Sequence, residues 1–553
     1  MTERTPTEID RIADEWVDTL AALQPTLATY IGRDIGQDRL DDFSPAGREA
    51  LRSAVVDTRA RLRAATPADD IDRVTQADLG AELDLQLELD EADWPLRDLN
   101  VIESPSQQVR NVFDLMPTAT ADDWATIGRR MSSIPAALDG YVETLREGMR
   151  RGVVPARRQV QEVAGQIDGY TGDTGFFARL TSQATSEGVV PDAVRADLER
   201  GQQAAREAYA RLQAFLRDEL APVASEQDAV GRELYALHSR GFLGAVIDLD
   251  ETYEWGREEL ARMVAEQEAI AREILPGATV EEAVAHLDRD ESRKLHGTDA
   301  LRAWMQETSD AAVAELGRTH FDIPEPVRRL ECMIAPTQEG GIYYTGPTDD
   351  FSRPGRMWSS VPEGVTEFDT WRELTTVYHE GVPGHHLQIG QATYNRAELN
   401  SWRRLLAGTS GHAEGWALYA ERLMEQLGYL DDPADRLGML DGQRMRAARV
   451  VLDIGVHLGK PRLEGDGTWD AAYALDFMRR NVNMEDGFIR FEVNRYLGWP
   501  GQAPSYKVGQ RIWEQVRDDY RAARGKDFSM KEFHKRALDL GGVGLDTLRS
   551  FVR

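Results

Sequence analysis

The sequence predicts a mainly helical protein that carries one small antiparallel β-sheet. Apolar residues recur every three or four positions through most of the chain, as Ile9, Ile12, Trp16 and Leu20 do near its start, which is the period of an amphipathic helix. Short apolar or aromatic runs bounded by Gly and Pro gather between residues 330 and 360 and are typical of strands. The chain has no low-complexity tract and no convincing internal repeat.

Helical periodicity defines the elements of the first half of the chain. Between Leu83 and Leu89 the leucines also alternate as in a strand, but the flanking helical period and the absence of turn signals favour a helix. Prolines interrupt the pattern without dividing domains, because another periodic segment follows each of them. We expect helices over residues 7–31, 46–66, 70–92, 122–150, 155–169, 190–219, 226–240 and 250–274, and two more within 280–317.

The predicted sheet precedes the helices of the second half. Its strands are expected over residues 332–335, 341–345 and 356–360. A helix that starts at Glu367 then has Trp371 and Tyr378 on one face. Further helices are expected over residues 411–427, 437–459, 507–523 and 530–540.

Composition and charge exclude several classes of partner. With 65 Lys and Arg against 95 Asp and Glu the formal charge is −30, which argues against nucleic acid and anionic membrane surfaces. A hydrophobic content of 41% is ample for a sizeable core. No stretch approaches the roughly 20 apolar residues of a membrane helix, and the N-terminus lacks the pattern of a secretory signal. The single cysteine, Cys332, suits a reducing compartment, so we expect a cytoplasmic protein.

The segment from His379 to Gln388 contains the residues best suited to bind a metal ion. Hydrolytic zinc sites use three protein ligands, commonly His and carboxylate, and leave a fourth position for water. Glu380 directly follows the first histidine, as the general base does in the His-Glu-x-x-His helix. Together with His385, His386, His412 and the later Glu414, these residues predict a divalent-metal site, with Zn²⁺ preferred and other divalent ions open.

The spacing departs from that motif because Pro383 stands where the second histidine would be. In a straight helix His379 and His385 would lie about 9 Å apart along the axis, too far to share one ion through bonds of about 2 Å. Glycines on both sides of the proline permit unusual backbone angles, and the proline interrupts the helix. We therefore expect the helix to end near Glu380 and a short loop to bring His385 back to the metal.

The strings 379–388 and 414–419 resemble the bacterial domain-of-unknown-function family numbered 885. Residues 353–355, 453–457 and 500–503 also look like motifs of that family, and the resemblance extends through most of the chain. The family looks like a helical, gluzincin-type zinc peptidase group. The resemblance therefore implies a metallopeptidase-like site with His379, His385 and Glu414 as metal ligands and Glu380 as base.

At 553 residues the chain is long for a single core, so division into several domains is one interpretation of its length. Helical peptidases instead form one large two-lobed body around a cleft, and we expect that organisation here. The N-terminal lobe would be mostly helical and cover residues 1–275. The catalytic lobe, residues 276–553, would carry the metal site and the sheet and would form one continuous body with the first lobe.

Several residues near the motif have open roles. Tyr343 and Tyr344 are candidates to line the cleft, where a strand beside the metal can pair with substrate backbone, although half-buried sheet aromatics fit the pattern equally. Glu421 shares a helix face with the predicted carboxylate ligand and could orient a ligand histidine or form a plain ion pair. The roles of His386 and His412 stay open.

The C-terminal region adds candidates for binding and catalysis. His457 follows Asp453 by four residues, so both lie on one helix face, and it is a candidate transition-state donor. Arg495 could hold a peptide carboxylate, and Tyr496 or Tyr506 could stabilise an oxyanion, with Tyr506 favoured. We expect Arg495, Tyr496 and residues 500–507 to form a loop, and simple loop packing is the alternative.

These observations predict a cytoplasmic zinc hydrolase that cleaves short peptides or acts on amino-acid-like molecules. A metal-dependent lyase or other non-peptide enzyme on the same scaffold is the first alternative, because a scaffold does not fix its chemistry. A metal-free binding protein is the second. The sequence leaves the substrate, exo- or endo-action, the metal and the oligomeric state open.

Overall fold

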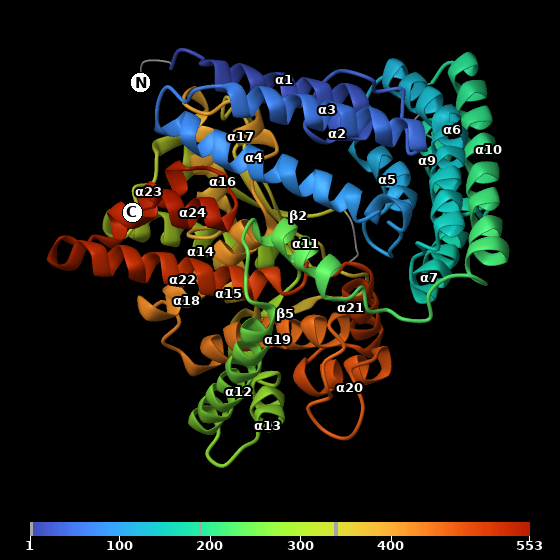
Figure 1. Cartoon of the computed structure of the whole chain (residues 1–553). Helices are drawn as coiled ribbons and strands as arrows, with labels where there is room; N and C mark the ends of the chain where they lie inside the picture. Colours follow the sequence, from blue (N-terminus) through green and yellow to red (C-terminus); the bar gives the residue numbers. More distant parts are fainter. Residues whose placement is uncertain (1–3, 187–189, 337–340, 553) are drawn as a thin grey trace.

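The computed structural model describes residues 4–186, 190–336 and 341–552, and it confirms a mainly helical chain (Figure 1). The first four helices lie across the top of Figure 1, and they belong to a small core of their own. Their bounds are α1 Glu8–Leu23, α2 Pro25–Tyr30, α3 Pro45–Ala64 and α4 Asp70–Glu91.

The helix predicted over residues 7–31 is two helices in the structure. Gln24 separates α1 from α2, because Pro25 has no backbone N–H to continue the helical hydrogen bonds. The leucines of residues 83–89 lie in helix α4, as expected, with Leu83 and Leu87 buried. This core is completed from a distant part of the chain by Trp402 of α17 (Ser401–Leu405).

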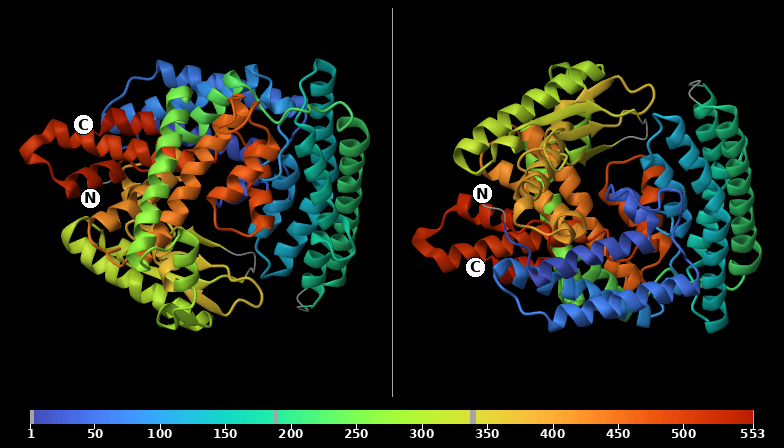
Figure 2. Two further views of the ribbon diagram at one scale, coloured as in Figure 1. Left: turned by 90° about the horizontal axis from the view of Figure 1, so that it is seen from below. Right: turned by 90° about the horizontal axis from the view of Figure 1, so that it is seen from above.

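A second group of helices has a core made only of residues 99–224. Helices α6 and α10 run side by side along one edge of the molecule in both views of Figure 2. Glycines permit this close approach: a Cβ on Gly201 would lie 2.8 Å from the carbonyl oxygen of Gly128. The group consists of α5 Pro105–Asn111, α6 Ala121–Arg151, α7 Arg157–Gln166, α8 Asp168–Thr171, α9 Phe176–Ser186 and α10 Asp192–Phe215.

The main core contains residues from Val74 to Val552 and includes most of the remaining helices. Helix α12 packs along α19, where Gly256 leaves room for the side chain of Val450. This contact crosses residue 275, so the division into two lobes at that point stays a prediction. The helices are α11 Arg232–Leu243, α12 Leu249–Ile274, α13 Val280–Leu287, α14 Thr298–Thr319, α15 Thr370–Glu380, α16 His385–Tyr394, α18 Ser410–Gln426, α19 Pro433–His457, α20 Ala471–Asn481, α21 Asp486–Gly498, α22 Ser505–Arg524, α23 Met530–Asp539 and α24 Leu545–Phe551.

The predicted sheet is present beside α15 and has three strands. Strands β3 (Ile342–Thr345) and β4 (Gly355–Ser359) pair antiparallel, as expected, whereas β2 (Leu330–Ile334) pairs parallel with β4. A second sheet was not predicted: β1 (Lys294–His296) pairs antiparallel with β5 (Glu367–Asp369). The helix predicted from Glu367 therefore starts only at Thr370, because the preceding three residues form that strand.

None of the helices in the described ranges combines the length and the apolar character that a membrane crossing requires.

Candidate metal centre

The turn between α15 and α16 brings the two histidines of the motif together. Helix α15 ends at Glu380, and α16 begins at His385, as the spacing predicted. The loop closes tightly, because the N–H of Gly384 donates to the carbonyl of Tyr378 at 3.1 Å. A Cβ on Gly384 would lie 1.9 Å from the carbonyl oxygen of His379, so this position requires glycine. The Val382–Pro383 peptide bond within the loop is cis.

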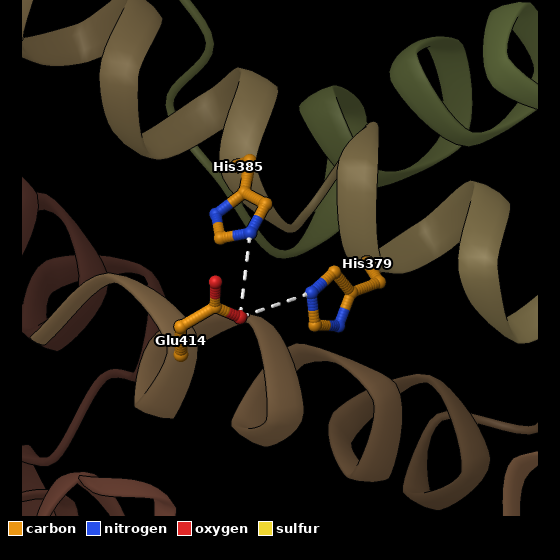
Figure 3. Close-up of side chains that lie close together, drawn as sticks. All are labelled: His379, His385 and Glu414. Carbon is orange, nitrogen blue, oxygen red and sulfur yellow. Dashed lines mark ion pairs between the residues drawn. The ribbon is translucent and has the colours of Figure 1, made fainter. Parts of the chain in front are cut away.

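His379, His385 and Glu414 converge on one point (Figure 3). The Oε2 atom of Glu414 lies 3.4 Å from Nε2 of His379 and 3.7 Å from Nε2 of His385. Ligands about 2.0–2.2 Å from a tetrahedral zinc ion are about 3.3–3.6 Å apart, so the first separation lies within this range and the second is slightly wider. Glu414 Oε2 is also buried without a hydrogen-bond partner, which a cation would supply.

Close helix packing places Glu414 at this point. Helix α18 contacts α22 through Gly415 and Gly509, where a Cβ on Gly415 would lie 2.4 Å from the backbone of Gly509. The side chain of Glu414 is still 24% exposed, so the cluster can be reached from the solvent. The donor set of two imidazoles and one carboxylate is that of a hydrolytic zinc site with an open position.

A chain of polar contacts behind His379 fixes the orientation of its ring. Nδ1 of His379 donates to Oε1 of Glu421 at 2.7 Å, which leaves Nε2 free for a metal ion. Gln443 donates to the other oxygen of Glu421 at 3.0 Å and accepts a hydrogen bond from Lys507 at 2.6 Å. Lys507 in turn forms an ion pair of 3.0 Å with Glu259. Both roles considered for Glu421 fit this contact, because it orients the ring of His379 and is also an ion pair when that ring is protonated.

The electrostatics of the cluster favour a positive charge at its centre. Burial opposes ionisation of Glu414, but the polar contact and charge of His379 and the charge of His385 outweigh it and lower the pKa of Glu414 to about 2. Burial also disfavours charge on His379, yet its contacts with Glu414 and Glu421 raise its pKa to about 10. Without an ion, a proton on His379 therefore supplies the positive charge that a metal would carry.

Glu380, the predicted base, is buried next to the cluster and is 7% exposed. Burial raises the pKa of its carboxyl to about 7, and the neighbouring charges of His379 and Glu414 act in opposite directions on it. The described residues offer this carboxyl no hydrogen bond. Its oxygens are therefore available to a small molecule at the centre.

Tyr506, the preferred oxyanion donor, lies close to the cluster on the first turn of α22. Burial and then the charge of Glu414 raise the pKa of its hydroxyl. Two guanidinium groups lie over its ring, with Cζ of Arg449 at 5.2 Å and Cζ of Arg446 at 5.9 Å from the ring centre. Arg446 was not predicted, since nothing in the local sequence distinguishes it from the other arginines of α19.

His386 points away from the cluster. Its Nε2 donates to the carbonyl of Val327 at 2.7 Å, and its Nδ1 accepts from the hydroxyl of Tyr344 at 2.9 Å. Both ring nitrogens are therefore used to tie α16 to the sheet region. Tyr344 is engaged in this contact, whereas Tyr343 is 41% exposed and stacks on Trp358.

His412, on the helix of Glu414, has a packing role in the described contacts. Its Nδ1 accepts from Gln388 at 3.3 Å, and its ring packs against Trp513. It does not belong to the cluster of possible metal ligands in the described residues.

The remaining candidates form a network around α21. His457 is 1% exposed, and its Nε2 donates to the carbonyl of Tyr496 at 3.0 Å. Arg495 forms an ion pair of 2.9 Å with Glu492, which also accepts from the hydroxyl of Tyr496. Arg495 and Tyr496 lie in helix α21, so the loop predicted for them is wrong, because that helix continues to Gly498. Residues 500–504 form a turn, as expected, whereas residues 505–507 of the same predicted loop begin helix α22.

Solved structures show that this fold is known. A protein from Colwellia psychrerythraea, described as a "putative lipoprotein", matches with a TM-score of 0.84 and 21% identity over 98% of both chains. A protein of unknown function from Shewanella oneidensis with the same description matches with a TM-score of 0.77 and 18% identity over 99% of both chains. These similarities establish the fold alone. No curated protein matches the sequence.

The resemblance suggested by the motifs is tested by comparison with known families. Residues 25–552 match a family described as "Bacterial protein of unknown function (DUF885)". This match includes the candidate metal cluster, the sheet and the helices from α2 onward, and it begins after α1. The chain therefore belongs to the DUF885 family of bacterial proteins.

Proposed function

We propose that this protein is a zinc-dependent hydrolase that cleaves short peptides. The observation that carries the proposal is the convergence of His379, His385 and Glu414, with the buried carboxyl of Glu380 next to the first of them in sequence. Two imidazoles and one carboxylate leave a coordination position for water, which is the arrangement of hydrolytic zinc sites. Because the same donors suit other divalent ions, the identity of the metal is part of the test.

When bound, the ion would act as a Lewis acid and lower the pKa of a coordinated water to roughly 7. The carboxylate of Glu380 would accept a proton from the attacking water and return it to the leaving amine. The hydroxyl of Tyr506 would donate a hydrogen bond to the oxygen on which negative charge develops. Glu421 would hold the ring of His379 in place during the reaction through the Nδ1 contact.

The gluzincin-type assignment and the two-lobed body around a cleft belong to this proposal. They are supported by the order of the ligands, since a His-Glu helix is followed by a Glu ligand from a later helix, α18. A substrate strand could pair beside the sheet, where the exposed Tyr343 would contact it.

A cytoplasmic location is also part of the proposal. The alternative is a location outside the cytoplasm, which the description of the two similar structures favours. Fractionation of cells that express the native gene would decide between them.

The first experiment measures metal content and peptide cleavage on the same preparation. We expect about one zinc ion per chain by mass spectrometry of the elements, and cleavage of a mixed library of di-, tri- and longer peptides. The Glu380→Gln variant should keep its metal and lose about 10²- to 10⁴-fold in turnover, because only the proton acceptor is removed. Glu373→Gln on the same helix is the matched control and should keep both.

Two outcomes would reject the proposal. Turnover of Glu380→Gln at the wild-type rate would remove Glu380 from the mechanism. The absence of any stoichiometric ion would favour a metal-free binding protein. Turnover of amino-acid-like metabolites without peptide cleavage would instead favour a metal-dependent lyase.

A further inference from the structure

One arginine beside the metal cluster has no anionic partner. Arg446 lies on α19, three residues after Gln443, which hydrogen-bonds Glu421. Throughout residues 4–186, 190–336 and 341–552, its guanidinium has no ion pair and no hydrogen bond, and its Nε is buried. A buried unpartnered Nε is shared by other arginines, Arg444 among them, but Arg444 has a partner on another guanidinium nitrogen, whereas Arg446 has none on any of its nitrogens in the described residues.

The other arginines of this region are already engaged. Arg449 forms an ion pair of 2.8 Å with Glu492, and Arg495 pairs with the same carboxylate. Arg444, on the same helix as Arg446, donates to Gln267 at 3.1 Å. Arg495, which the sequence suggested as a carboxylate binder, is therefore occupied, and Arg446 is free to bind an anion.

Arg446 lies on the side of α19 that faces the candidate metal centre. Gln443, one turn earlier on the same helix, donates to Glu421 at 3.0 Å, and Glu421 contacts His379. The guanidinium of Arg446 lies 5.9 Å from the ring centre of Tyr506, which places it beside the proposed oxyanion donor.

The helix itself makes room for this orientation. Arg446 extends back along α19 toward Gly442, as long side chains on helices do. A Cβ at Gly442 would lie 2.7 Å from Nη1 of Arg446. A larger residue at 442 would push the guanidinium out of its present position.

We propose that Arg446 binds the free carboxylate of the substrate, so that the site acts on the C-terminal end of short peptides. This inference rests on the proposed hydrolase function and adds the substrate class and exo-action. The planar guanidinium matches a carboxylate with two parallel hydrogen bonds, a geometry that a lysine cannot reproduce. With its carboxylate held there, the peptide would present a carbonyl near its end to the cluster, beside Glu380 and Tyr506.

Paired substrates test this assignment. Two mixtures of N-acetylated tetrapeptides with identical sequences are compared, one with free C-terminal carboxylates and one with C-terminal amides. We expect the wild-type protein to favour the free carboxylates, and Arg446→Gln to raise KM for them by about 10- to 100-fold while leaving the amides unchanged. Arg446→Lys should restore only part of the difference, and Arg444→Gln on the same helix should behave as wild type.

A binding measurement separates this inference from the proposed function. Calorimetry compares zinc-loaded Glu380→Gln with zinc-loaded Glu380→Gln/Arg446→Gln, using one acetylated tetrapeptide and its amide as probes. We expect the double variant to bind the free carboxylate about 10- to 100-fold more weakly and the amide equally. Metal content and thermal unfolding show whether both variants are folded.

The outcomes are distinguishable. Equal use of carboxylates and amides by the wild-type protein, or equal loss on both in Arg446→Gln, overturns the role of Arg446 and leaves the hydrolase proposal standing. Cleavage of neither mixture counts against the hydrolase proposal, and the calorimetry then decides on Arg446 alone. Equal affinity of the two zinc-loaded variants for the free carboxylate overturns the inference in that case.

Discussion

In the described part of the chain, buried histidines on helices meet carboxylates around His379 and around His457, and the surroundings of these two places differ. At the metal centre, His379 has Glu421 on one ring nitrogen and Glu414 near the other, and His385 faces the same oxygen of Glu414. Around His457, one ring nitrogen donates to a backbone carbonyl, and Asp453 lies 3.8 Å away.

The acids of the two places differ in their partners on one oxygen only. Oδ2 of Asp453 accepts hydrogen bonds of 2.8 Å from both the hydroxyl of Tyr235 and the N–H of Gly501, so Asp453 ties three elements together. Its Oδ1, like Oε2 of Glu414, is buried without a hydrogen-bond partner, so an unpartnered oxygen alone does not distinguish the two places. In the described part of the chain, three possible ligand atoms converge only around His379. A buried His–carboxylate pair thus indicates a metal site only when further ligands meet it at an open point.

Replacing one histidine of each pair tests this comparison with the largest expected effect. His385→Ala should lose stoichiometric zinc and all measurable turnover, because only two ligands remain. His457→Ala should keep the zinc and lower the free energy of unfolding by about 1–3 kcal/mol, since it leaves buried partners unpaired. Elemental analysis and denaturant unfolding measure both. A folded His457→Ala protein without zinc would contradict the distinction.

Tyr506→Phe removes the hydroxyl that we assign to the oxyanion. We expect kcat to fall by about 10²- to 10³-fold with unchanged metal content, as for other oxyanion donors. Tyr496→Phe is the control, because its hydroxyl is bound to Glu492. Steady-state kinetics on a cleaved library peptide measures both variants. Equal losses in kcat would mean that Tyr506 has no special part in catalysis.

Glu421→Gln and Asp453→Asn compare the acids of the two pairs directly. The first should weaken zinc affinity by about 10- to 100-fold, because the carboxylate no longer orients His379. The second should leave zinc affinity unchanged. Competition with a fluorescent chelator gives both dissociation constants. A weaker zinc site in Asp453→Asn would show that the two regions are coupled.

A third acid, Glu82, shows how burial changes the pKa of a carboxyl that has no cation beside it. Glu82 of α4 borders a cavity of about 700 Å³ between the N-terminal helices. Burial and then the charge of Asp78 raise the pKa of Glu82 from 4.5 to about 8. The folded protein holds this proton more tightly than the unfolded chain, so the stabilisation is complete below pH 4.5 and is lost as the pH rises toward 8.

Glu82→Gln should remove this pH dependence. We expect the variant to be more stable than the wild type by on the order of 2 kcal/mol at pH 8, and the difference to disappear near pH 4.5. Urea unfolding at both pH values measures it. Glu88→Gln on the same helix is the control. Parallel stability curves for Glu82→Gln and the wild type would show that Glu82 is ionised in the folded protein at all these pH values.

The predictions succeeded where short segments carry their own signal. Gly and Pro between Glu380 and His385 indicated the end of α15 and the return of the chain, and the helical period indicated α4 despite its alternating leucines. They failed where a partner is distant in sequence. Residues 367–369 look like a helix start, but pairing with residues 294–296 makes them a strand. Helix α21 was missed, so Arg495 and Tyr496 were expected in a loop.

The sequence by itself determined the mainly helical class, the family and the set of candidate metal ligands that converge in the structure, because periodicity and compact motifs are local properties. Only the tertiary structure decided which polar groups are already occupied. Lys507 and Glu259 lie 248 positions apart, yet they end the chain of contacts that holds His379. Nothing in the sequence distinguishes Arg446 from Arg495. They differ because Glu492 forms an ion pair with Arg495, whereas no acid among the described residues pairs with Arg446.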